Sequence, residues 1–413
     1  MTVLATSSMG SVLIFGASMY LSSADNAAFL SFWGVLMGVS SALSPVEQEI
    51  SRQAAAAATR ERKPGPNSVR AFAVSQTVAV TVAALLAVPL VNAQLFGQHR
   101  GLTIVAEIGI VAIPALYAMR GMFVGSGKIG RYSTILLAEA GTRLALFTGF
   151  IIAGLRGPSW LGFAVAGGSC AWLPFTLCIR ESVDNSAPSE PWAALWRRML
   201  GLILGSALTA SVLTGYPALV KLVAPRGSEE ALSGLFLAVS LIRSPLLLVL
   251  SPIQTLAVPT IVRVLQQTEG QRRIKQYAVA GAGGTLIVGL ITSTVAFLVG
   301  PWMFHLLYRD KFVVSASTMA ALGWSGTALA ATMLTSTVLV ARKQAGRVAA
   351  VWAAVAAVTL LLLASTYTID VRAVLGAVVG PTVGLAVALV MVISGRDPEA
   401  GTGPENATVP QST

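Results

Sequence analysis

Charged residues, cysteine and histidine are all scarce in this chain. Asp, Glu, Lys and Arg make up only 11% of its 413 residues, whereas a soluble globular domain carries about a quarter. The two cysteines, Cys170 and Cys178, are eight residues apart on one predicted helix, a rise of about 12 Å that is too long for a disulfide. His99 and His305 have no partner at metal-ligand spacing. We therefore expect no metal, no cofactor and no redox chemistry.

Hydrophilic sequence long enough to form a soluble domain is also missing, and apolar sequence takes its place. Hydrophobic residues make up 55% of the chain, and the mean hydropathy is +0.75. A membrane-crossing helix needs about 20 mostly apolar residues. Twelve stretches meet this requirement, which predicts an all-α, polytopic membrane helix bundle. They lie at 3–21, 26–49, 70–92, 101–121, 131–154, 158–179, 195–220, 229–255, 276–299, 314–341, 348–368 and 371–394.

Basic residues alternate between the loops that join these stretches. With the N-terminus inside, the inward loops and the C-terminal end hold 19 of the 28 Lys and Arg residues, the outward loops hold 7, and 2 lie within spans. This distribution follows the positive-inside rule, so we expect a multi-pass membrane protein with both termini in the cytoplasm. The excess of Arg over Lys, 22 to 6, and the richness in Ala suggest the cytoplasmic membrane of a bacterium. The same arrangement explains the net charge of +11 by contacts with anionic lipid headgroups, and we expect no nucleic-acid partner.

The two halves of the chain resemble each other. Residues 29–47 align without gaps to 236–254, sharing a Leu-Ser-Pro triplet, and residues 123–133 align to 339–349 through a Gly-Arg pair. Both matches join spans that are six apart, which predicts two parallel six-helix repeats with a binding cavity between them. The expected organisation is an N-terminal lobe at 1–180, a cytoplasmic connector at 181–194, a C-terminal lobe at 195–395 and a disordered tail at 396–413.

A few charged residues fall inside or at the ends of the predicted spans, where they are costly and often functional. Glu139 and Arg143 are four residues apart and share a helix face, either as a stabilising ion pair or as a site for proton or substrate coupling. Arg243 has no acidic neighbour within a helical turn. It is expected to face a wet cavity or an anionic ligand, or to pair with a carbonyl or a distant acid such as Glu107. Lys221 could extend an electropositive path. The candidates are thus Arg243, Arg143 and Lys221 for phosphate, and Glu139 and Glu107 for coupling.

Four segments carry a resemblance to a known family: YLSSADNAAFLSFWGVLMGVSSALSPVEQEISR at 20–52, RGMFVGSGKIGRYSTILLAEAGTRL at 120–144, LIRSPLLLVLSPIQTLAVPTIVR at 241–263 and VGPWMFHLLYRDKFVVSASTMAALGW at 299–324. With the twelve spans, the chain resembles the lipid-linked oligosaccharide flippases of the multidrug/oligosaccharidyl-lipid/polysaccharide (MOP) exporter superfamily. The resemblance implies a V-shaped, two-lobed transporter that moves a polyprenyl-pyrophosphate-linked glycan to the outer leaflet. It also implies a cationic cavity, in which Arg243 matches the family's basic position in the eighth span.

The chain differs from the related peptidoglycan-precursor flippases in having twelve spans rather than fourteen and no basic residue in the first. The glycan is therefore not identified. Membrane lipids and glycan polymerase or assembly proteins are the other expected partners. The alternatives are a cation- or proton-coupled drug or metabolite antiporter of the same superfamily, a membrane glycosyltransferase or polymerase, and a non-transporting scaffold. A catalytic role would need a sizeable outward loop, and the outward loops here are short, so we expect no enzyme activity.

Overall fold

The computed structural model describes residues 2–59, 63, 65–178, 190–265, 270–342 and 344–394. Every regular element in these ranges is a helix, which confirms the all-α prediction. The helices are α1 Thr2–Tyr20, α2 Ser23–Leu43, α3 Pro45–Ala58, α4 Pro66–Ala87, α5 Pro89–Phe96, α6 Arg100–Gly125, α7 Ile129–Ile152, α8 Pro158–Gly167, α9 Trp192–Leu213, α10 Tyr216–Val223, α11 Glu229–Leu265, α12 Gly270–Tyr308, α13 Ala316–Ala341, α14 Ala345–Leu363 and α15 Ile369–Ser394. Three short 3-10 segments are η1 Gly168–Cys170, η2 Leu173–Cys178 and η3 Arg309–Lys311.

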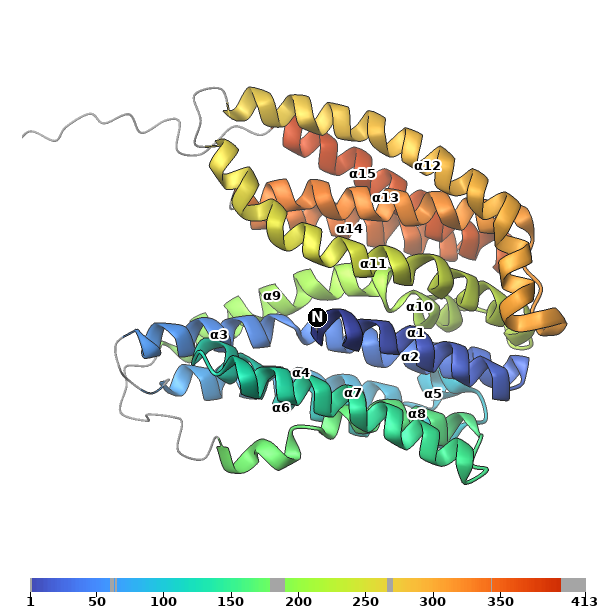
Figure 1. Cartoon of the computed structure of the whole chain (residues 1–413), viewed down its shortest axis with the longest axis horizontal. Helices are drawn as coiled ribbons and strands as arrows, with labels where there is room; N and C mark the ends of the chain where they lie inside the picture. The colour runs from blue at the N-terminus through green and yellow to red at the C-terminus, as the bar shows by residue number, and fades with distance from the viewer. Residues whose placement is uncertain are drawn as a thin grey trace, which may run out of the picture.

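The helices form two bundles (Figure 1). One contains α1–α8 and the other α11–α15, with α9 and α10 between them. Helix α9 begins at Trp192, inside the predicted connector. The connector residues 181–189 and the predicted disordered tail at 396–413 lie outside the described residues.

Among the described residues, eight helical stretches are long and apolar enough to cross a membrane, with α2 and α3 counted as one, or nine if α9 and α10 form one bent span. The apolar stretch of α1 at Met9–Tyr20 is shorter than such a helix requires. Helix α12 exposes many of its large apolar side chains, among them Leu286, Ile287, Leu290 and Leu298. Such a surface is stable against lipid but not against water, so the protein is a membrane protein.

Several predicted spans are interrupted where the sequence contains glycine or proline. The span at 158–179 is predicted as one helix, but α8 ends at Gly167 and the chain continues as 3-10 turns. A β-carbon on Gly168 would overlap the side chain of Arg143, so this glycine lets η1 approach α7 closely. The third span breaks before Pro89, whose ring allows it only in the first turn of α5. The seventh bends by 77° between α9 and α10.

The two halves touch at the end of the bundle that is predicted to face outward, here called the outer end. Asn26 at the start of α2 donates a hydrogen bond to Ser233 at the start of α11, with an Nδ2–Oγ distance of 2.9 Å. Lys311 in η3 donates to the carbonyl oxygen of Ser18 in α1 at 2.8 Å. Helices α2 and α11 run in the same direction and are in contact (Figure 1). This parallel arrangement is the one that the internal repeat predicts.

Candidate functional site

A cavity of about 370 Å³ lies inside the first bundle, between α1, α2, α6 and α7. Its volume falls within the usual range for small-molecule sites. Apolar side chains form most of the wall, but three charged residues from α6 and α7 also line it. The lining residues are Met9, Gly10, Leu13, Trp33, Met37, Arg120, Tyr132, Leu136, Glu139, Ala140 and Arg143.

Glu139 is held between two arginines at this cavity. Its side chain is buried, with the whole residue only 9% exposed. Arg143, one turn later on α7, places Nη2 2.6 Å from Oε1 of Glu139. Arg120, near the end of α6, donates from Nη2 to the other oxygen, Oε2. Each guanidinium thus takes one carboxylate oxygen, and the three groups together carry one net positive charge.

The two guanidinium groups are oriented by further contacts. Arg143 donates from Nε to the carbonyl oxygen of Val165 in α8 at 3.1 Å. Arg120 Nη1 lies 3.9 Å from Glu47 at the start of α3, too far for a hydrogen bond. The buried Nε of Arg120 has no hydrogen-bond partner among the described residues. An unsatisfied buried donor is costly, so Arg120 has binding capacity that the protein itself does not use.

Two tyrosines complete the polar surroundings. Tyr117 lies under the guanidinium of Arg120, with 5.6 Å from Cζ to the ring centroid, and its hydroxyl is 2.6 Å from that of Ser40 in α2. Tyr132 lines the cavity and lies near the carboxylate of Glu47. Counting Glu47, the cluster contains two acids and two arginines and is neutral as a whole.

Arg243 lies elsewhere, in α11, and only 4% of its surface is exposed. It donates from Nη1 to the carbonyl oxygen of Val212 at 2.8 Å, and Nη2 is 3.4 Å from the hydroxyl of Ser325. Its Cζ lies 5.1 Å from the ring centroid of Tyr216. No carboxylate among the described residues contacts it. Of the partners considered from the sequence, the structure gives Arg243 a carbonyl rather than Glu107.

Lys221 and Glu107 are not part of the cavity. Lys221, in α10, is 4% exposed and places Nζ 2.7 Å from Oε1 of Glu229 at the start of α11. This ion pair neutralises the positive charge that the sequence suggests could extend an electropositive path. Glu107 is half-buried in α6 and does not line the cavity. The structure therefore brings together Arg143 and Glu139 and separates them from the other three candidates.

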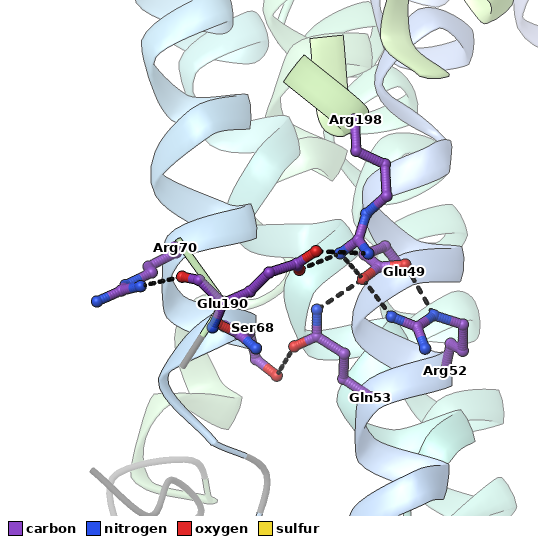
Figure 2. A network of polar contacts seen from close by, with 8 residues as sticks. Glu49, Arg52, Gln53, Ser68, Arg70, Glu190 and Arg198 are labelled. Carbon is purple, nitrogen blue, oxygen red and sulfur yellow. Dashed lines mark hydrogen bonds and ion pairs between the residues drawn. The ribbon is translucent and has the colours of Figure 1, made fainter. Parts of the chain in front are cut away.

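A second polar cluster surrounds Glu49 in α3 (Figure 2). Glu49 is 7% exposed and accepts hydrogen bonds from Arg52 at 2.7 and 2.9 Å, from Gln53 at 2.7 Å and from Arg198 of α9 at 2.8 Å. Arg198 also approaches Glu190 at 3.0 Å. The cluster thus joins α3, α9 and the end of the connector, so it ties the first bundle to the helix that begins the second half.

Two residues of the site are missed by sequence reasoning. From the sequence, Arg120 is interpreted as an anchor of a cytoplasmic loop. Glu47 is not identified as a candidate, because it falls at the end of a predicted span. Neither has a helical-spacing partner that would reveal it, since their contacts cross from α6 to α7 and to α3. Glu49, which is not among the candidates from the sequence, is also buried.

The chain has relatives among mycobacterial proteins. No family model matches it. The uncharacterized protein Rv1510 of Mycobacterium tuberculosis (strain ATCC 25618 / H37Rv) is 25% identical over 366 residues, which cover 87% of this chain and 82% of the relative. The uncharacterized protein Mb3654 of Mycobacterium bovis is 25% identical over 392 residues, covering 93% and 89%. These similarities extend over nearly the whole chain.

Solved structures show the fold. An inward-facing multidrug resistance MATE family transporter of the MOP superfamily matches with a TM-score of 0.66 at 16% identity, covering 95% of this chain and 94% of that one. An outward-facing MATE transporter gives a TM-score of 0.57 at 14% identity, covering 95% and 92%. A MOP superfamily transporter from Pyrococcus furiosus, whose binding pocket is described as having reverse polarity, gives 0.60 at 15% identity, covering 95% and 93%. The protein therefore has the fold of a MATE-like membrane transporter.

Proposed function

We propose that this protein translocates a polyprenyl-pyrophosphate-linked oligosaccharide from the cytoplasmic to the outer leaflet by alternating access. The observation that supports this most directly is the placement of arginine in the membrane-spanning part. Arg120 and Arg143 line the cavity, and Arg243 is buried without a carboxylate partner among the described residues. Burying a guanidinium in a membrane costs free energy, and such residues are usually functional. Binding of a phosphate-bearing substrate is a function that suits these arginines.

The chemistry of the arginines favours this substrate class. A guanidinium presents a planar fork of donors that fits two phosphate oxygens at once. The attraction is strengthened where water is excluded. The prenyl chain can stay in lipid while the pyrophosphate binds the arginines. The transporter fold, which does not by itself specify a substrate, is compatible with this arrangement.

A cation-exporting antiporter is the second candidate. Cation binding favours unpaired acids, whereas Glu139 is already bound by two arginines. For the Pyrococcus furiosus transporter, the reverse polarity of the binding pocket is described as suggesting a different function. By analogy, an arginine-lined cavity in this fold supports an anionic substrate. An enzyme or a scaffold has no comparable support.

The test is to deplete the protein in cells and analyse total lipids by mass spectrometry, with inverted membrane vesicles to report sidedness. We expect a polyprenyl-pyrophosphate oligosaccharide to accumulate on the cytoplasmic leaflet. Re-expressed Arg243→Ala should fail to restore export at normal membrane levels. Arg226→Ala, which removes an exposed arginine at the outer end, is the matched control and should restore it. Unchanged lipids together with altered resistance to cationic dyes would favour the antiporter.

A further inference from the structure

We infer that the cavity in the first bundle is a phosphate-ester site that Glu139 occupies when no ligand is bound, and that ligand binding is coupled to uptake of one proton by Glu139. The inference deepens the proposed function and rests on it for the identity of the transported ligand. It assigns the same ligand chemistry, a phosphate or pyrophosphate ester, to Arg120 and Arg143.

The two arginines around Glu139 form an anion-binding site, and the Glu139 carboxylate is the anion bound in it. Arg143 binds one carboxylate oxygen at 2.6 Å and Arg120 binds the other. A phosphate group offers the same kind of paired anionic oxygens to guanidinium groups. The carboxylate therefore stands where two oxygens of a phosphate would bind.

The site has room and unused donors for a larger anion. The cavity of about 370 Å³ adjoins all three charged groups, and the buried Nε of Arg120 has no hydrogen-bond partner among the described residues. A phosphate has more acceptor oxygens than a carboxylate, so it can satisfy this donor as well. The wall also contains apolar side chains, among them Trp33 and Met37.

The charge balance links the ligand to a proton. The two arginines stabilise the ionised form of Glu139. When a phosphate takes over both guanidinium groups, the buried Glu139 carboxylate loses its counter-charges beside a new anion. A like charge at short range favours the neutral form, so Glu139 binds a proton from the aqueous phase as the ligand binds. By linkage, a lower pH must then increase affinity for the anion.

Other charged and titratable groups around Glu139 are accounted for. They are Arg120 and Tyr117 from α6, Arg143 and Tyr132 from α7, and Glu47 from α3. The arginines stay protonated over the accessible pH range. Glu47 lies near Tyr132 and 3.9 Å from Arg120, so it is the other acid that could contribute. A Glu139→Gln variant separates the two, because it keeps the shape of the side chain and leaves Glu47 in place.

The experiment uses the full chain in lipid nanodiscs and a short-chain farnesyl-pyrophosphoryl-N-acetylglucosamine as the probe, a pyrophosphate diester whose own charge is constant near neutral pH. Calorimetry in two buffers of different ionisation enthalpy should report about one proton taken up per probe bound by the wild-type protein. Its affinity should rise by up to about tenfold for each unit of pH decrease. Glu139→Gln should bind tightly at every pH with no proton uptake. Glu230→Gln, an exposed acid, should behave as wild type.

The outcomes distinguish this inference from the proposed function. Probe binding without proton uptake, and with the same pH profile in Glu139→Gln, would overturn the inference and leave the flippase proposal standing. Proton-linked binding of glycerol phosphate or phosphatidylglycerol but not of the probe would support the anion site and count against a glycan substrate. Binding of none of these anions by a protein that unfolds as cooperatively as wild type would overturn both. The proton count needs only the wild-type protein, so the inference can be tested even if the variant does not fold.

Discussion

Asn26 and Ser233 are 207 residues apart and bond to each other, with 2.9 Å between Nδ2 and Oγ. The same offset of 207 relates the aligned segments 29–47 and 236–254. Asn26 and Ser233 therefore occupy equivalent positions of the internal repeat. Only residues beside a two-fold axis can contact their own equivalents, since those further away meet different partners. The pseudo-symmetry axis of the protein thus passes between these two side chains at the outer end.

Breaking this contact should loosen the junction between the halves. We expect a double-mutant cycle of Asn26→Ala and Ser233→Ala to give a coupling free energy of about 0.5–1.5 kcal/mol, the usual net value of a hydrogen bond. Thermal unfolding of the purified variants in nanodiscs measures it. Strictly additive effects would mean that the two side chains do not cooperate in the membrane. Ser315→Ala, which removes an exposed N-cap of α13, provides a reference for a local loss.

The sequence identifies local and periodic features well. The offset of the repeat relates Asn26 to Ser233, and these two residues are in contact in the structure. Helical spacing alone predicts the ion pair of Glu139 and Arg143. It could not reveal that Arg120 completes the site. Positions on different helices become neighbours only through packing, and an arginine near a helix end is also what the positive-inside rule predicts for an anchor.

The same limitation explains why the sequence does not show the partner of Lys221 or the early end of the sixth span. Lys221 is expected from the sequence to be available to a ligand, yet its partner Glu229 lies across the turn between α10 and α11. Turn geometry decides this pairing, and hydropathy carries no information about it. Just beyond the end of α8 at Gly167, Arg143 packs against Gly168, which again is a contact between separate elements.

Filling the space beside Gly168 should move Arg143. A β-carbon there would overlap the Arg143 side chain, so we expect Gly168→Ala to lower export and to cost about 1–3 kcal/mol of stability, as overpacking usually does. Complementation of depleted cells and thermal unfolding measure the two effects. Gly149→Ala in α7, where nothing lies within 4 Å of the added carbon, is the control. Equal behaviour of the two variants would contradict the close approach.

The cluster around Glu49 should stabilise the contact between α3 and α9 without taking part in ligand binding (Figure 2). Glu49→Gln keeps the size of the side chain but removes the charge that Arg52 and Arg198 contact. We expect a loss of about 1–3 kcal/mol, typical of hydrogen bonds to charged groups, with no change in affinity for the farnesyl probe. Thermal unfolding and calorimetry on the same sample test both parts. A large drop in affinity at unchanged stability would assign the cluster to the binding site instead.

The pair formed by Lys221 and Glu229 predicts an asymmetric response to mutation. The Lys221 side chain is 5% exposed and that of Glu229 is 31% exposed. Glu229→Gln leaves a buried ammonium without its counter-charge, which we expect to cost about 3 kcal/mol. Lys221→Met leaves a partly hydrated carboxylate and should cost about 1 kcal/mol. The double variant should be more stable than Glu229→Gln alone, because no buried charge remains.

Thermal unfolding of the three variants, together with export in depleted cells, decides what Lys221 does. If its role is to pair with Glu229, export should follow stability, and the double variant should recover much of both. If Lys221 instead guides an anionic substrate, as its charge and sequence position suggest, Lys221→Met should abolish export at nearly normal stability. The double variant would then remain inactive, because restoring the charge balance does not restore an ammonium group for the phosphate to bind.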